Sequence, residues 1–321
     1  MKLFHSLLYP LLGGLFCLSC SDDEQDTGTK QPTTAGEVTF GVDLTGFSTR
    51  VTQDGSSWND GDKIGTYVLD MKTLEPVTEA ANVPYVCSEE GASVSFTSTT
   101  PLKVQNDGTP VKFVAYYPYN ADVRNFNYPV QLAAQERGST ACDLLYAATK
   151  EEYTYSPENE PHISLNFTHR LAKVILKFVN MEKEPLEVSD VRIEGMQTAA
   201  SFNIQTDVLT VDESSVATIN PYHNATTGFY EAIILPSALT DSYKVSFVLD
   251  DREKEWIFTN LDIALPQFHK GYSYTFALYI DDSGFVEMGR LENVEGGNSS
   301  APWEDGSSED GTAEGDKTPV S

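Results

Sequence analysis

The sequence predicts an all-β protein, on three observations. Short runs rich in Val, Ile, Thr, Phe and Tyr recur between clusters of Gly, Pro, Asn and Asp, which is the composition of strands separated by turns. Phe and Tyr are abundant, at 16 each, whereas Met and Trp number 5 and 3. No run carries an apolar face at helical spacing over a convincing length. Strands at this spacing are typical of an antiparallel β-sandwich.

The first residues resemble an export signal that ends in a lipid-attachment site. Lys2 precedes an apolar run, Leu7–Leu18, which is too short to span a bilayer. Leu18-Ser19-Cys20 resembles the lipobox of bacterial lipoproteins, so residues 1–19 are expected to be a lipoprotein signal peptide and Cys20 the acylated amino terminus. An ordinary signal peptide is the alternative. Residues 21–24, Ser-Asp-Asp-Glu, resemble the acidic tag that directs Bacteroidetes lipoproteins to the outer face of the outer membrane.

Net charge limits the partners of the chain. There are 48 acidic and 21 basic residues, which gives a formal net charge of -27. Such a charge disfavours nucleic acid as a partner and makes attraction to an anionic membrane surface unfavourable. We therefore expect acyl chains on Cys20, and not charge, to hold the protein at the outer membrane.

Composition divides the mature chain into a tether, two domains and a tail. Residues 20–35 are mostly Asp, Glu, Gln, Thr, Gly and Pro, which predicts an acidic flexible tether. Residues 151–161 hold two prolines and four acids, the best domain boundary in the chain. The expected domains are residues 36–154 and 163–294, each a β-sandwich. Residues 295–321, rich in Gly, Ser, Asp and Glu, predict an acidic disordered tail.

The first domain is expected to open with a half-buried strand. Val38, Phe40, Val42 and Leu44 alternate with polar or small residues, which is the period of a strand with one buried face. Turn residues at 58–63 follow this strand. Further strands are expected at Ile64–Leu69, Tyr85–Cys87, Ser93–Phe96, Val111–Tyr117 and Leu144–Ala147.

The second domain contains the most apolar run after the leader, Leu171–Val179. Its β-branched residues and the strands around it favour a central strand over a helix. The other strands expected here are Ile163–Phe167, Val188–Ile193, Phe202–Ile204, Val208–Val211, Val216–Ile219, Phe229–Leu235, Tyr243–Leu249, Trp256–Phe258 and Tyr272–Ile280.

Two cysteines are available for a disulfide in the mature chain once Cys20 carries lipid. They are Cys87 and Cys142, and export to an oxidising compartment permits the bond. Two buried thiols are the alternative. One pair of cysteines does not define a disulfide framework, so the predicted fold is the same whether Cys87 and Cys142 form a disulfide or stay as thiols.

No catalytic residue, metal or cofactor is expected. His162 and His169 lie seven positions apart, which places them on opposite faces of a strand, so they should not share a metal ion. The acidic segments Asn59–Asp62 and Asp281–Gly284 lack the further acids of a calcium loop and are better explained as turns. The sequence has no Gly-x-Ser-x-Gly elbow, no phosphate-cradling glycine loop and no His-Glu-x-x-His. These observations favour a protein that is not an enzyme.

Tyrosines gather at Tyr116-Tyr117-Pro118-Tyr119. Such rings could stack on a sugar, but the preceding run already alternates as a strand that buries at least one of them. The favoured interpretation is a strand end.

Taken together, ordered landmarks resemble the fimbrillin or Mfa-like family of Bacteroidales type V pilus proteins. They are the lipobox at Cys20, Val38-Thr39-Phe40, Ser48-Thr49-Arg50, Trp58 with Asp60–Gly65, Ala115–Tyr119, Asp143–Ala147, Phe167–Ala172, Ile234-Leu235-Pro236 and Gly271–Tyr274. The resemblance implies two tandem β-sandwiches of transthyretin-like topology, a lipid-anchored protein exposed on the cell surface, and a structural or adhesive role in a fimbria. Its implied partners are other pilus subunits and host or bacterial surface ligands.

In the resembled family, a trypsin-like protease cuts after an arginine and frees the first strand. Arg50 in Ser48-Thr49-Arg50-Val51 is the matching position, with a plain loop arginine as the alternative. Candidate donor strands are Phe276–Ile280 and Phe285–Val294, although the first reads as a core strand and the second alternates poorly. A surface lipoprotein that binds glycans through its sandwiches is the alternative function.

Overall fold

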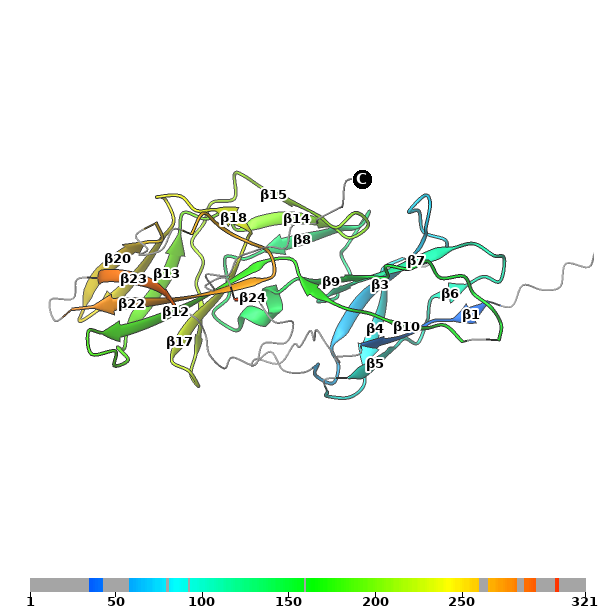
Figure 1. The fold of residues 1–321 in the computed structure, drawn as a ribbon, viewed down its shortest axis with the longest axis horizontal. Coiled ribbons are helices and arrows are strands. Elements are labelled where there is room, and N and C mark those ends of the chain that lie inside the picture. The colour runs from blue at the N-terminus through cyan, green and yellow to red at the C-terminus, as the bar shows by residue number, and fades with distance from the viewer. Residues whose placement is uncertain are drawn as a thin grey trace, which may run out of the picture. The chain divides into compact units, whose positions relative to one another are not determined.

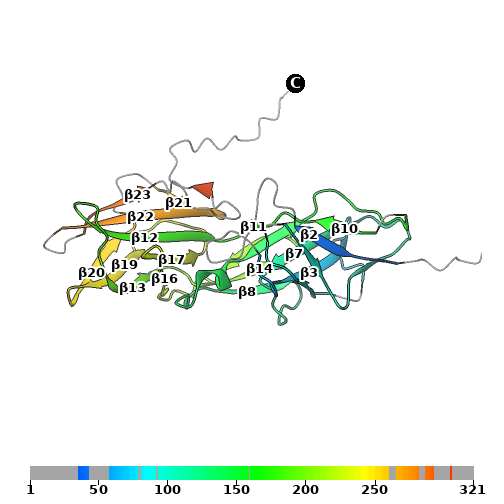
Figure 2. The ribbon, with the colours of Figure 1, turned by 90° about the horizontal axis from the view of Figure 1, so that it is seen from below.

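The computed structural model describes residues 35–42, 58–78, 81–91, 93–158, 160–259, 265–281, 286–292 and 304–305. Within these ranges the protein is all-β, as the sequence predicts, and its one helical element is the short 3-10 turn η1 at Ser139–Cys142. Figures 1 and 2 show the strands from two directions. The transthyretin-like topology of the sandwiches stays a prediction.

Eight strands from residues 39–169 form one sheet. Their order is β10-β2-β5-β4-β3-β7-β9-β11. The bounds are β2 Thr39–Val42, β3 Lys63–Asp70, β4 Val83–Cys87, β5 Val94–Thr97, β7 Val111–Tyr117, β9 Leu145–Ala148, β10 His162–Ser164 and β11 Thr168–His169. The short strands β1, Gly36–Glu37, and β6, Lys103–Val104, pair beside it.

Both faces of this sheet are buried, which explains why its central strands are apolar almost throughout. Along β3, Ile64 and Val68 enter one cluster, whereas Tyr67 and Leu69 enter another. The first cluster receives side chains from seven strands of this sheet, β2 to β5, β7, β9 and β10, and from the neighbouring β6, so the sheet folds around it. Trp58 is fully buried in this cluster and makes edge-to-face contacts with three other aromatic rings.

A three-stranded sheet covers the second cluster. Its order is β15-β14-β8, with β8 at Asn127–Gln131, β14 at Ala199–Asn203 and β15 at Val208–Val211. Strand β8 precedes the expected domain boundary and β14 follows it, yet the two pair over five residues and run side by side in Figure 1. Gln135, which is 1% exposed, also connects residues on the two sides of the expected boundary, because its side-chain amide exchanges hydrogen bonds with the backbone of Ile233.

The remaining strands make a two-sheet sandwich around a third cluster. One sheet has the order β16-β17-β12-β22-β23, with β24 paired to β22, and the other is β13-β19-β20. The bounds are β12 Ala172–Asn180, β13 Ser189–Glu194, β16 Tyr222–Asn224, β17 Phe229–Ile234, β19 Lys244–Leu249, β20 Arg252–Ile257, β22 Tyr272–Ile280, β23 Val286–Glu292 and β24 Glu304–Asp305. A short pair, β18 Ser237–Ala238 and β21 Gln267–Phe268, lies outside these sheets.

Most expected strands are present, and one is wrong. Leu171–Val179 is confirmed as a central strand, because β12 has β17 on one side and β22 on the other. Val216–Ile219 forms only isolated bridges, and Val216 is 55% exposed, so this apolar run does not build a strand. The expected antiparallel arrangement also needs correction, since β12 pairs with β22, and β2 with β10, in parallel.

The domain boundaries stay a prediction. Ile163–Phe167 supplies β10 and enters the first cluster. In the expected tail, Glu304–Asp305 pairs with the start of β22, and the rest of that tail lies outside the described residues. Pro161, at the end of the linker, accepts a hydrogen bond from the backbone N–H of Thr39 at 2.9 Å.

Candidate functional site

Strand β2, called the first strand below because it is the first in the chain to join the eight-stranded sheet, lies at an internal position of that sheet. Strand β2 pairs in antiparallel fashion with β5 on one side and in parallel with β10 on the other. Figure 2 shows β2 beside β10. The edge of β2 is therefore covered, although β10 contributes only three residues to the ladder.

Apolar burial holds this strand in place. Val38, Phe40 and Val42 are 0%, 0% and 2% exposed, and all three belong to the first cluster. The Phe40 ring packs edge-to-face on Tyr85 and Phe113, with centroids 4.8 and 5.8 Å away. Burying side chains of this size contributes about 1.5–3 kcal/mol each, so the three together contribute roughly 5–9 kcal/mol. Leu44, which the sequence adds to this strand, lies outside the described residues.

Tyr85 adds a polar clamp at the start of the strand. Its hydroxyl donates to the carbonyl of Val38 at 2.9 Å and accepts from the N–H of Leu102 at 2.8 Å. The N–H of Val38 in turn donates to the carbonyl of Leu102 at 2.9 Å. Burial raises the pKa of Tyr85 to about 12, so the hydroxyl keeps its proton and donates at physiological pH. The clamp satisfies backbone groups that would otherwise be buried without partners.

On the other side of the strand, His162 lies across Gly41. A Cβ atom at Gly41 would come within 2.6 Å of Nε2 of His162, so a larger residue there would displace the imidazole. Nδ1 of His162 lies 3.1 Å from the Thr39 hydroxyl. The glycine thus leaves room for a side chain of β10 to reach over β2.

Sequence reasoning did not find the residues that fix the first strand. The sequence pattern indicates Tyr85 only as part of a strand, and His162 only as a residue that should not share a metal ion with His169. The contacts of Tyr85 join segments 17 and 47 residues away in the sequence, and those of His162 reach 123 positions back. No local spacing records such contacts, so the sequence held no signal for them.

Two predicted site residues cannot be placed. Cys20, the expected acylation site, and Arg50, the expected processing site, both lie outside the described residues. Within the described ranges, no helix is long and apolar enough to cross a membrane.

The two remaining cysteines are present as thiols. Cys87 is buried in the first cluster and donates to the carbonyl of Glu89 at 2.9 Å, whereas Cys142 packs against the second cluster. Burial raises the pKa of both thiols above its usual value. Both groups therefore stay protonated at neutral pH, where a thiol is a poor nucleophile.

His169 and the first acidic turn take structural roles, whereas residues 282–284 of the second acidic segment lie outside the described residues. His169 is 5% exposed, and its Nδ1 lies 2.8 Å from Oδ1 of Asp143. No group of three or more His, Cys, Asp or Glu residues suited to a metal ion is found among the described residues. Asp62 closes its own turn, because its carboxylate accepts from the N–H of Asn59 at 2.7 Å and from the Tyr117 hydroxyl at 3.2 Å. In the tyrosine motif, Tyr116 and Tyr117 are buried and Tyr119 is half-buried.

Known proteins similar to this chain are a fimbrillin-like family and solved structures of cell adhesion proteins. A model of the fimbrillin-like family matches residues 49–303. A candidate cell adhesion protein from Bacteroides uniformis has a TM-score of 0.65 at 22% identity, over 82% of this chain and 99% of its own. A second one, from Bacteroides ovatus, has a TM-score of 0.59 at 15% identity, over 83% and 97%. No curated protein matches this chain.

The likeness to these two structures concerns the fold, because both identities are low. The family match spans more than half of the chain, from before Trp58 to beyond β23. It includes the sheet that surrounds the first cluster, except for β2, which precedes residue 49, and the sandwich around the third cluster. The chain therefore belongs to the fimbrillin-like family.

Proposed function

We propose that this chain is a pilus-associated surface lipoprotein with a structural and adhesive role. Acylated Cys20 holds it at the outer membrane, and its partners are other pilus subunits, which it joins by strand exchange. Membership of the fimbrillin-like family supports the pilus role. The observation that carries strand exchange is the position of β2, which lies between two strands that can each pair with a replacement.

Cleavage after Arg50 would separate the first strand from the body of the protein. All contacts of β1 and β2 with the sheet are non-covalent, so residues up to Arg50 could then leave. Trp58 is held independently, because its backbone exchanges hydrogen bonds of 3.0 and 3.1 Å with Gly91. The chain after the cut would stay fixed at this fully buried tryptophan. The cut would thus remove one strand and leave the rest of the sheet intact.

Loss of β2 would leave a slot of defined chemistry. Its floor would be the apolar cluster that Val38, Phe40 and Val42 now cover, and its walls would be the unpaired edges of β5 and β10. An extended segment can enter by pairing with both edges and burying alternate side chains. An open sheet edge over an apolar floor is unstable in water, which favours this occupation. The donor would run parallel to β10 and antiparallel to β5, as β2 does.

Strand β23 is the candidate donor in this chain. It ends the sheet order β16-β17-β12-β22-β23, so its outer edge has no strand partner within the described residues. Val286-Glu287-Met288-Gly289 repeats the order apolar, polar, apolar, glycine of Val38-Thr39-Phe40-Gly41. Phe276–Ile280, the other candidate, lies inside β22 between β12 and β23, which makes it a core strand.

Cleavage and assembly can be tested together. The full chain, purified in detergent, is treated with a trypsin-like protease, and the new amino terminus and the oligomeric mass are measured. We expect a cut after Arg50, loss of the first strand and formation of oligomers. Arg50→Ala should abolish all three, whereas Arg137→Ala, at an exposed arginine outside this region, should abolish none. Cleaved protein that stays monomeric with its first strand bound would refute strand exchange.

The donor is tested separately by truncation before Val286. The truncated chain should still be cut and should still accept a strand, yet it should not polymerise alone. Mixing it with cleaved full-length chain should restore short oligomers. If the truncated chain polymerises as the full chain does, β23 is not the donor.

A further inference from the structure

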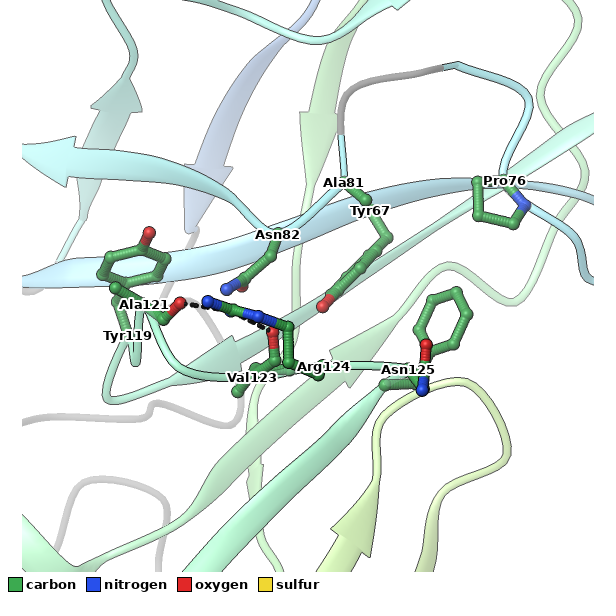
Figure 3. A pocket seen from close by; sticks show the side chains of 10 residues that line it. Tyr67, Pro76, Ala81, Asn82, Tyr119, Ala121, Val123, Arg124 and Asn125 are labelled. Carbon is green, nitrogen blue, oxygen red and sulfur yellow. Dashed lines mark hydrogen bonds between the residues drawn. The ribbon is translucent and has the colours of Figure 1, made fainter.

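A cleft of about 460 Å³ opens beside β3, away from the first strand. Figure 3 shows the residues that line it, among them Tyr67, Asn82, Tyr119, Arg124 and Asn125. Among the described residues that line the cleft there is no aspartate or glutamate, although the chain carries 48 acidic residues. A cleft of this size lies in the range typical of small-ligand sites.

Tyr67 points a free hydroxyl into this cleft. The residue is 3% exposed, and its oxygen faces Arg124 in Figure 3. No described residue forms a hydrogen bond with this hydroxyl, whereas the hydroxyl of the neighbouring Tyr116 donates to Asn82 at 2.6 Å. Burial raises the pKa of Tyr67 to about 12, so the group is a hydrogen-bond donor at neutral pH. A tyrosine hydroxyl that faces a cleft without a protein partner is suited to bind a ligand.

Arg124 is held across the same cleft by its own loop. Its Nη1 donates to the carbonyls of Ala121 at 2.6 Å and Val123 at 2.9 Å, the bonds dashed in Figure 3. No carboxylate among the described residues pairs with it, in contrast to Arg170, which forms a two-point pair with Asp207. A fixed guanidinium with remaining N–H donors is the group that best recognises a carboxylate.

Aromatic rings complete the lining. Asn125 and Phe126 occupy a tight turn between the bridged residues Arg124 and Asn127, and both have positive φ, at 50° and 62°. A bulky residue in this conformation is strained, and such strain is often kept where a side chain has a function. The Phe126 ring centroid lies 4.8 Å from that of Tyr67. Tyr119 also lines the cleft, so one ring of the tyrosine motif is available to a ligand.

We propose that this cleft binds an acidic sugar, a uronic or sialic acid residue of a surface glycan. Arg124 binds the carboxylate, the Tyr67 hydroxyl donates to an oxygen of the sugar, and the aromatic rings pack on its apolar face. The described lining residues carry the positive charge of Arg124 and no carboxylate, which favours a negatively charged ligand. The site is independent of strand exchange, because none of its residues belongs to β1, β2 or β23.

Binding is measured by calorimetry with three probes on the detergent-purified full chain. The probes are an oligogalacturonide, the neutral galacto-oligosaccharide of the same length, and acetate. We expect the acidic sugar to bind at least about tenfold more tightly than either of the others, since hydrogen bonds to charged groups are the strongest. Arg124→Gln should remove the preference for the acidic sugar. Arg137→Gln, which removes the same charge at an exposed site outside the cleft, should leave it unchanged.

Tyr67→Phe separates a binding role from a structural one. Since the hydroxyl has no described partner in the free protein, its loss should leave thermal stability unchanged and weaken acidic-sugar binding by about tenfold. Tyr153→Phe is the control, because it removes a hydroxyl that likewise has no partner but is buried outside the cleft. Equal binding of the neutral sugar, competition by acetate alone at equal strength, or absence of binding at millimolar concentration would each overturn the proposal. An unchanged affinity in Tyr67→Phe would do the same.

Discussion

Tyr85→Phe tests how the first strand is held. The change removes one oxygen atom and leaves the ring that packs on Phe40. It leaves the Val38 carbonyl and the Leu102 N–H without partners in a region where Val38 and Leu102 are both 0% exposed. An unpaired buried polar group costs about 1–3 kcal/mol, so two such groups cost roughly 2–6 kcal/mol. We expect the lower half of this range, because a water molecule can occupy the space left by the hydroxyl.

The assay has an equilibrium part and a kinetic part. Urea unfolding of the uncut chain gives the loss of stability, and mass spectrometry after cleavage gives the rate at which the first strand dissociates. Because each 1.4 kcal/mol corresponds to a factor of about ten, a loss of about 2–3 kcal/mol confined to this strand should speed dissociation roughly 30- to 150-fold. Tyr153→Phe, which removes a buried hydroxyl without a partner, should neither lower stability nor speed dissociation. A Tyr85→Phe protein as stable as the wild type, with the same dissociation rate, would refute the clamp.

The remaining predictions concern pH, the junction, the anchor and the linker. Burial raises the pKa of Tyr67, Tyr85 and Tyr146 to about 12, so the folded state holds these protons more tightly than the unfolded chain. This contribution to stability is complete below about pH 10 and is lost as the pH rises towards 12; a urea midpoint that is flat over this range would contradict it. Gln135→Glu should destabilise the protein by about 3 kcal/mol or more, because it sets a carboxylate against the carbonyls of Leu132 and Ile233. Gln131→Glu, at an exposed position of β8, is its control in thermal unfolding. Cys20→Ala should move the protein from the membrane to the soluble fraction, since acyl chains supply the anchoring, and unchanged retention would contradict the lipoprotein prediction. Limited proteolysis should cut first in residues 151–161 or in the tails, and an early cut within β12 would count against the two-domain division.

Strands were predictable where burial leaves a local pattern. Val111–Tyr117 has the bounds expected from its sequence, because it is a central strand whose two faces both enter apolar clusters. Strand β8 was missed because Asn127 and Pro129 read as turn residues. Proline is tolerated there because β8 is an edge strand, which leaves one side of its backbone unpaired. The start of β20 was missed as well, because Arg252 and Glu253 are charged. These two residues are exposed, and β20 lies at the edge of a three-stranded sheet.

The direction and the partners of the strands could not be predicted. Alternation of apolar residues is the same in a parallel and an antiparallel neighbour, so nothing in Ala172–Asn180 indicates that β22 runs parallel to it over eight residues. Likewise, Tyr85 stands at a position that the sequence pattern indicates only as a buried residue of a strand. Its two hydrogen bonds form because the fold brings the backbones of Val38 and Leu102 to its hydroxyl. The cleft beside β3 was hidden for the same reason, since Tyr67 reads as a core residue and Arg124 as a loop cation.

The parallel pairing of β2 with β10 fixes an order of folding. Thr39 and His162 are 123 positions apart in the sequence, so β2, near the start of the chain, cannot complete its ladder until more than a third of the chain has followed it in synthesis. Strand β3 pairs with β4 and with β7 over shorter separations, so these three strands can form before that point. Amide protons of β2 should therefore become protected against exchange later than those of β3 during refolding. The strand that completes its pairing late in the making of the monomer is therefore the one that we propose to be exchanged.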